Sequence, residues 1–285
     1  DRWHLQGSNG SGKTTLLSLI LGHHPRSFSL PAERLTLFSR PRRSLATPTL
    51  RRLIGHASPE IFAAFPRGMG LGAGEVVGTG YEGVFARRKM TPAQRERIMS
   101  LLRPFKDLLV VRAFTATTTT TTTTAAAAAV AADDLTRIYD TDFSHFPPSQ
   151  QALLLFLRAI VARPSLLILD EASQGMDEES WARCRALLER EWQEMARTGQ
   201  EQAVVVVSHW EEEVSVGDST VFFVRRFSRA DGCFAGPMGS RTGSGFTITR
   251  WQGRTGIIES MLGIVICNVT TALCGGLLQA GMVYS

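Results

Sequence analysis

The chain has 285 residues, of which 44% are hydrophobic and 20% are charged. This composition is typical of a globular protein and excludes a chain too polar to bury a core, while the length suits one large domain or two small ones. Lysine and arginine outnumber aspartate and glutamate by 31 to 26, which gives a formal net charge of +5. This small excess favours polyanions without requiring them, and a bound nucleotide alone accounts for it.

The four cysteines indicate neither a zinc site nor a disulfide framework. They form no CxxC pair and no dense cluster, and they lie at Cys184, Cys233, Cys267 and Cys274. We therefore expect a reducing, intracellular compartment, with the cytoplasm as the simplest choice and an organelle left open. The chain starts at Asp1 without a methionine or a signal-like apolar segment, so we infer that its amino terminus is missing.

The chain is predicted to begin with a strand, a glycine-rich loop and a helix. Residues 3–6 are strand-like, and residues 14–21 are good helix formers that end at Gly22, a favourable C-terminal cap. The arginine-rich stretch 25–52 contains few acids and is predicted to be a solvated connection. The glycine-rich stretch 68–74 lacks the GxGxxG spacing, so we predict a flexible joint there rather than a dinucleotide site.

The later elements predict an α/β fold. Apolar patterns predict helices over 91–105, 149–163 and 178–197, and buried strands over 165–169 and 203–207. The helix over 178–197 carries an apolar stripe that we interpret as core, namely Trp181, Cys184, Leu188, Trp192 and Met195. Buried strands that alternate with amphipathic helices indicate a mostly parallel sheet flanked by helices, with ligands at the carboxyl ends of the strands.

A phosphate-binding loop follows the first predicted strand. The pattern GxxxxGK[ST] is matched at every fixed position by Gly7, Ser8, Asn9, Gly10, Ser11, Gly12, Lys13 and Thr14. Its glycines allow backbone amides to turn toward phosphate oxygens, and the next helix points its positive end at the same anion. Lys13 should reach the β- and γ-phosphates and Thr14 should offer a hydroxyl to Mg²⁺, while Thr15 completes the binding segment. The sequence therefore predicts an ATP–Mg²⁺ site.

Two further elements supply candidate catalytic groups. The apolar strand that starts at Leu166 ends in Asp170 and Glu171. Asp170 could hold the Mg²⁺ shell and Glu171 could orient or deprotonate the attacking water, although a strand that simply ends in solvated acids is the bland alternative. His209 directly follows the strand over 203–207, where it could contact the γ-phosphate.

The order of these motifs resembles that of the ABC ATPase family. The glycine loop corresponds to Walker A, Asp170-Glu171 to Walker B, and His209 to the switch histidine, while Gln174-Gly175-Met176-Asp177 corresponds to the D-loop. The QGMD form of the D-loop looks most like the soluble molybdate-transport or photorepair-type subgroup. The segments Ile54-Gly55-His56-Ala57-Ser58-Pro59-Glu60 and Gly78-Thr79-Gly80-Tyr81-Glu82 also resemble that subgroup.

The resemblance implies a P-loop NTPase core with a helical subdomain and a second nucleotide-binding half as partner, in tandem or as a dimer. It implies a nucleotide-binding domain over residues 1–226, with the helical subdomain at about 90–160. Within it, the threonine- and alanine-rich tract inside residues 115–132 is predicted to be a low-complexity insertion. Residues 227–285 do not resemble the family and form an irregular carboxyl-terminal tail. In such pairs ATP lies between the P-loop of one half and the signature loop of the other, so this chain would be incomplete for turnover alone.

Three departures from the family pattern affect hydrolysis. Pro147 stands at the signature serine position and has neither a hydroxyl nor an N–H donor, and Ser149 stands at a later glycine position. The Q-loop glutamine is absent, with Ser58-Pro59-Glu60 in its region. The aromatic residue that stacks on adenine would lie before Asp1. We therefore expect ATP binding to survive better than ATP hydrolysis.

Two alternative functions stay open at this point. Arginines at 40–52 and the run Arg87-Arg88-Lys89 motivate a nucleic-acid or ribosome-associated module, although aromatic residues are not interleaved with them. The departures at Pro147 and in the Q-loop motivate a nucleotide-binding pseudo-ATPase. The apolar run 262–283 is long enough to cross a bilayer, but a tail that packs on the core or a gene-model artefact explains it equally well.

Overall fold

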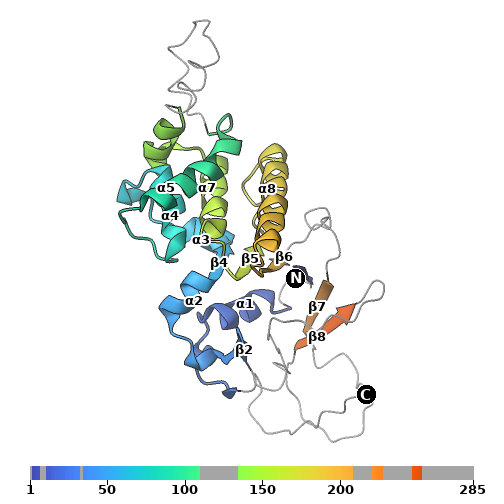
Figure 1. Cartoon of the computed structure of the whole chain (residues 1–285). Helices are drawn as coiled ribbons and strands as arrows, with labels where there is room; N and C mark the ends of the chain where they lie inside the picture. The colour runs from blue at the N-terminus through green and yellow to red at the C-terminus, as the bar shows by residue number, and fades with distance from the viewer. Residues whose placement is uncertain are drawn as a thin grey trace, which may run out of the picture. The chain divides into compact units, whose positions relative to one another are not determined.

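The computed structural model describes residues 2–6, 11–32, 35–109, 134–207, 220–226 and 246–251 (Figure 1). The chain divides into two compact units. The first contains residues 1–47, 207–209 and 217–285, and the second contains residues 48–206 and 210–216. The predictions for the start of the glycine loop (Gly7–Gly10), the low-complexity tract, His209 and the run 262–283 lie outside the described residues.

The first unit contains the predicted strand and helix. Strand β1 (Arg2–Gln6) pairs in parallel with β7 (Thr220–Arg226), with Trp3 opposite Thr220, and β8 (Phe246–Trp251) runs antiparallel to β7. Helix α1 (Lys13–Leu21) buries leucine and isoleucine side chains and ends at Gly22, whose φ of 81° is left-handed. The Gly22 N–H donates to the carbonyl of Ser18, which confirms the predicted cap.

The arginine-rich stretch after α1 is more ordered than a solvated connection, and this prediction is wrong for most of its length. The stretch contains the hairpin β2 (Thr36–Leu37) and β3 (Arg40–Pro41) and the start of α2 (Thr47–Leu53), with 3₁₀ turns η1 (Pro25–Ser27) and η3 (Arg42–Ser44).

Arg42 is the clearest departure from that prediction, because its side chain is only 1% exposed. Its guanidinium donates to the carbonyls of Ile20 (3.3 Å) and Leu45 (3.2 Å) and lies 4.8 Å from the ring centre of Phe28. Burial lowers the pKa of Arg42. The buried cation meets the carbonyl end of α1, which the helix dipole favours.

The second unit contains the predicted buried strands. Strand β4 (Ile54–Ala57) pairs in parallel with β5 (Leu166–Asp170), so that Ile54 lies opposite Leu166, and β6 (Ala203–Val207) is the neighbour on the other side of β5. Every residue of β5 is buried. An all-apolar strand that is buried on both faces is expected where helices cover a parallel sheet.

Helices make up the rest of the second unit. They are α3 (Pro59–Ala64), α4 (Ala73–Gly78), α5 (Pro92–Leu102), α7 (Pro148–Ile160) and α8 (Glu178–Arg197), with 3₁₀ turns η4 (Arg67–Met69), η5 (Thr79–Tyr81), η6 (Arg103–Phe105) and η8 (Phe143–His145). Helices α4, α5 and α7 share one hydrophobic core, in which Val76, Ile98 and Leu153 are fully buried. No helix within the described ranges is both long and apolar enough to cross a bilayer.

The predicted helices agree with the structure in their centres and differ at some ends. Helix α5 begins after Thr91, whose hydroxyl accepts the N–H of Gln94 in a capping box. Helix α7 ends at Ile160, before the predicted end at Arg163, because Arg163 has a left-handed φ of 49°. The stripe of α8 is buried at Trp181, Cys184 and Met195, but Leu187 is buried where Leu188 was expected, and Leu188 and Trp192 are only half-buried.

The glycine-rich stretch over 68–74 is not simply a flexible joint, so this prediction also needs correction. Its last residues enter α4, and Ala73 and Gly74 are buried. A side chain at Gly74 would place its Cβ 2.1 Å from the ring of Tyr139. Gly74 is therefore needed for close packing of α4 against this aromatic ring.

Candidate functional site

The start of α1 has the features of an anion site. Gly12 precedes the helix with a left-handed φ of 105°, which few residues other than glycine adopt. Lys13 is the first helical residue and is 8% exposed, while the Thr14 side chain is exposed. The hydroxyl of Ser11 is buried and has no hydrogen-bond partner in the part of the chain that the structure describes. A phosphate oxygen would satisfy this hydroxyl.

This geometry fits the predicted nucleotide and metal. The first N–H groups of a helix have no partner within the helix, and they favour an anion together with the helix dipole. Lys13 adds a full positive charge at the same end, and the exposed Thr14 hydroxyl is a hard oxygen ligand of the kind that Mg²⁺ prefers. Lys13 and Thr14 belong to the first unit, whereas Asp170 and Glu171 belong to the second.

The carboxyl end of β5 carries the two predicted acids. Asp170 is the last residue of the strand and is 8% exposed. Glu171 follows it with a left-handed φ of 47°. This conformation costs a non-glycine residue about 1–2 kcal/mol, and backbone strain of this kind concentrates at functional sites. The strained residue is therefore the one for which the sequence predicted a catalytic role.

The turn after β5 leads into α8. The N–H of Gln174 donates to the carbonyl of Glu171 over 2.9 Å, and the N–H of Met176 donates to Ser173 over 2.9 Å. Asp177 then caps α8 by accepting the N–H of Ser180 at 2.7 Å, and this hydrogen bond lowers the pKa of Asp177. The segment compared with the D-loop is thus fixed at both ends.

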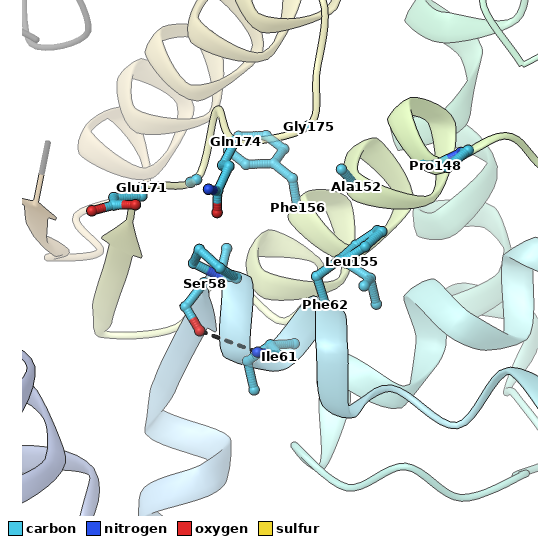
Figure 2. Close-up of a pocket in the computed structure, with 13 residues that line it drawn as sticks. Ser58, Ile61, Phe62, Pro148, Ala152, Leu155, Phe156, Glu171, Gln174 and Gly175 are labelled. Carbon is cyan, nitrogen blue, oxygen red and sulfur yellow. Dashed lines mark hydrogen bonds between the residues drawn. The ribbon is translucent and has the colours of Figure 1, made fainter. Parts of the chain in front are cut away.

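A cavity of about 290 Å³ lies beside Glu171 (Figure 2). The loop after β5 forms one wall, and α3 and α7 form the others. Its lining is mostly apolar and consists of Ala57, Ser58, Pro59, Ile61, Phe62, Pro148, Ala152, Leu155, Phe156, Glu171, Ala172, Gln174 and Gly175. Glu171 is the only ionisable residue among them, so the one charge in the lining is at the predicted catalytic position.

Ser58 lies at this cavity, in the region that the sequence compared with the Q-loop. Its hydroxyl accepts the N–H of Ile61 at 3.2 Å and caps α3. The residue is 8% exposed. The serine therefore has a local structural task, because an N-cap satisfies a backbone donor that the helix cannot satisfy itself.

The segment compared with the signature loop is held by two residues that sequence reasoning missed. Pro147 caps α7 without a side-chain hydrogen bond. The buried carboxamide of Gln151 donates to the carbonyls of Phe143 (3.2 Å) and Phe146 (2.8 Å) and accepts from Arg67 at 3.0 Å. A signal for Gln151 was present in the sequence, since it is a polar residue at the start of a strongly apolar helix.

The described arginines that motivated a nucleic-acid function are largely matched by acids. Arg52 and Arg88 both pair with Glu82, and Arg87 pairs with Glu75 at 3.6 Å and also donates to the carbonyl of Gly70. Arg42, from the same basic stretch, is buried. The local excess of positive charge is thus smaller than the sequence alone indicated, which weakens the argument for that alternative.

Together these features define a P-loop nucleotide-binding domain, with a glycine loop before a helix and two acids after a buried parallel strand. The sequence matches the ABC transporter family over residues 1–174, which is more than half of the chain. The chain therefore belongs to the ABC transporter family, as an ATP-binding cassette domain. This confirms the family resemblance and the fold class drawn from the sequence.

Similar proteins carry the same family name. An uncharacterised ABC transporter ATP-binding protein of Schizosaccharomyces pombe is 30% identical over 217 residues, which cover 75% of this chain and 37% of that protein. The ABC transporter ATP-binding protein ModF of Escherichia coli is 30% identical over 213 residues, which cover 74% and 36%. The chain thus spans little more than a third of the length of these relatives.

Solved structures share the fold. A dimeric ATP-binding cassette in a post-hydrolysis state, bound to ADP and Pi, superposes with a TM-score of 0.53 at 18% identity, covering 79% of this chain and 81% of that one. A bacterial Atm1-family ABC exporter with ATP bound gives a TM-score of 0.51 at 13% identity, covering 78% of this chain and 32% of that one. At these identities the likeness concerns the fold alone.

Proposed function

We propose that this chain binds ATP with Mg²⁺ through Gly7–Thr15 and hydrolyses it after closing against a second nucleotide-binding half. The observation that carries the proposal is the amino end of α1, where left-handed Gly12 leads into Lys13 and a buried Ser11 hydroxyl lacks a partner among the described residues. These groups supply positive charge and hydrogen-bond donors where a triphosphate needs them.

Each site residue has a proposed role. The Lys13 ammonium contacts the β- and γ-phosphates, and the oxygens of Thr14 and Asp170 hold Mg²⁺. Bound Mg²⁺ would neutralise charge that develops on the phosphates. Glu171 orients and deprotonates the attacking water, and its left-handed backbone fixes where the carboxylate begins. His209 contacts the γ-phosphate.

A second half completes the site in this proposal. Support comes from a dimeric ATP-binding cassette that shares the fold and from relatives nearly three times as long as the matched segment. We assign residues 1–226 to the nucleotide-binding domain and residues 227–285 to a separate tail. Cysteine spacing without pairs supports a reducing intracellular compartment.

Slow hydrolysis is part of the proposal. Pro147 offers no N–H or hydroxyl to a facing nucleotide, and the Ser58 hydroxyl is used to cap α3. A pseudo-ATPase that binds but does not turn over ATP is the second candidate, and these same two observations favour it.

Calorimetry and turnover assays on the full chain together with its second half test the proposal. We expect Lys13→Ala to abolish measurable ATP affinity, and Lys89→Ala, which removes an exposed lysine, to leave it unchanged. Glu171→Gln should keep ATP affinity and lose most of the turnover. Unchanged affinity in Lys13→Ala would refute the binding site, and measurable affinity without turnover in the unaltered pair would favour the pseudo-ATPase.

A further inference from the structure

Few side chains supply polar atoms to the cavity beside Glu171. Among its lining residues, only Ser58, Glu171 and Gln174 have polar side chains, and the other ten are apolar or glycine. An apolar lining excludes water and strengthens each electrostatic interaction within it. The chemistry of this cavity therefore depends on these three groups.

Ser58 is already used. Its hydroxyl oxygen accepts the N–H of Ile61 and closes the first turn of α3 (Figure 2). Loss of such a cap costs about 1 kcal/mol, so the serine is held in this arrangement. A neutral polar group for a ligand beside Glu171 must come from elsewhere in the cavity.

Gln174 stands on the same turn as Glu171. The backbone hydrogen bond of 2.9 Å from Gln174 to the carbonyl of Glu171 fixes the two residues relative to each other. The turn is anchored on one side by buried β5 and on the other by the cap that Asp177 makes on α8. Such anchoring holds both side chains with little further loss of conformational entropy.

The Gln174 carboxamide complements the carboxylate chemically. Figure 2 shows its side chain extending from the turn toward Ser58, with Glu171 beside it on the same turn. Within the described residues, the Gln174 side chain makes no hydrogen bond. A carboxamide both donates and accepts, whereas an ionised carboxylate only accepts. The pair can therefore hold a water molecule in one orientation.

We propose that Gln174 is a further residue of the hydrolysis site and that its carboxamide orients the water that Glu171 deprotonates. The inference rests on the proposed function. Glu171 takes one proton from the water, and the water oxygen forms a bond to the γ-phosphorus. The bond from that phosphorus to the β,γ-bridging oxygen breaks, and ADP leaves with the electron pair. Gln174 hydrogen-bonds to the water and exchanges no proton.

Steady-state kinetics on the full chain with its second half provide the first test. Gln174→Ala should lower kcat about 10- to 100-fold, in line with the contribution of a group that positions water, while the KM and calorimetric affinity for ATP stay within twofold. Gln174→Asn, which keeps the carboxamide, should restore part of the loss. Gln200→Ala removes an exposed glutamine just after α8 and is the matched control, with no change expected.

A double-mutant cycle separates a shared water from independent effects. In the Glu171→Gln background, Gln174→Ala should lower the remaining rate less than threefold, because both residues act on one molecule. A full additional loss, a wild-type kcat in Gln174→Ala, or a fall in melting temperature that accounts for its lost activity would overturn the inference. If the unaltered chain shows no turnover, the proposed function fails with it, and this is seen before any substitution is made.

Discussion

The guanidinium of Arg67 donates a hydrogen bond of 3.0 Å to the carboxamide oxygen of Gln151, across 84 positions of sequence. Arg67 also donates to the carbonyl of Phe62 at 3.0 Å and lies over its ring at 4.7 Å. Gln151 in turn holds the carbonyls of Phe143 and Phe146. These two side chains therefore tie the end of α3 to the segment before α7.

We expect Gln151→Leu to destabilise the second unit by about 2 kcal/mol, because it leaves a part-buried guanidinium group and two carbonyls without a partner. Urea unfolding followed by circular dichroism measures this difference. Gln193→Leu, on the exposed side of α8, serves as the control and should change stability by less than about 0.5 kcal/mol. Equal stabilities of the two variants would contradict the role given to Gln151.

Gly22 tests the ending of α1. Gly22→Ala combines a left-handed φ of 81° with a Cβ that would lie 1.9 Å from Nη2 of buried Arg42. Gly199→Ala is the matched control, because Gly199 has a similar φ of 69° but nothing within 4 Å. Strain alone costs about 1 kcal/mol, so we expect Gly22→Ala to lose clearly more stability than Gly199→Ala in thermal unfolding. The same loss in both would show that Arg42 moves aside freely.

Glu191 predicts a dependence of stability on pH. Its carboxylate accepts from Arg97 at 2.8 and 2.6 Å and from Arg163 at 3.1 Å. Burial opposes ionisation, but the two guanidinium groups hold the pKa of Glu191 below its ordinary value of 4.5. The folded state therefore binds the proton less tightly than the unfolded state. The contribution is complete above the unfolded pKa and disappears as pH falls through the lower folded pKa.

At neutral pH, Glu191→Gln should cost about 2 kcal/mol, a modest figure because both arginines are partly solvated. The difference from the unaltered chain should shrink below about pH 4, where the carboxylate begins to protonate in either state. Denaturant unfolding at several pH values measures it. Glu201→Gln, at an exposed residue, should show no such trend, and a difference that stayed constant down to pH 2 would contradict the assignment.

The strain at Glu171 can be separated from its chemistry. Glu171→Gly and Glu171→Ala both remove the carboxylate, so both should lose turnover. Glycine accepts a φ of 47° freely, and alanine does not. We expect the glycine variant to unfold with a free energy about 1 kcal/mol higher than that of the alanine variant, and the reverse order would argue against stored strain.

Local sequence patterns were sufficient to predict most of the central elements. Strands β5 and β6 and the centres of α1, α5, α7 and α8 were read from apolar runs and caps, and the glycine loop was read from fixed spacing. Those signals act over a few residues. The contacts that were missed join distant positions, such as Arg67 with Gln151 or Gly74 with the Tyr139 ring. Arg42 was missed because an arginine-rich stretch is usually solvated, and only the packing against α1 shows otherwise.

The two prolines at the start of α7 have a consequence for a closed pair. Proline carries no amide hydrogen, so Pro147 and Pro148 remove two donors from this helix end, and the N–H of Gln151 is used on the carbonyl of Pro147. Only Ser149 and Gln150 retain amides there for an approaching anion. In the proposed pair, the nucleotide seated on the other half would meet a poorer set of donors than the one on α1. Such asymmetry would make the two halves unequal in how firmly they grip their ligands.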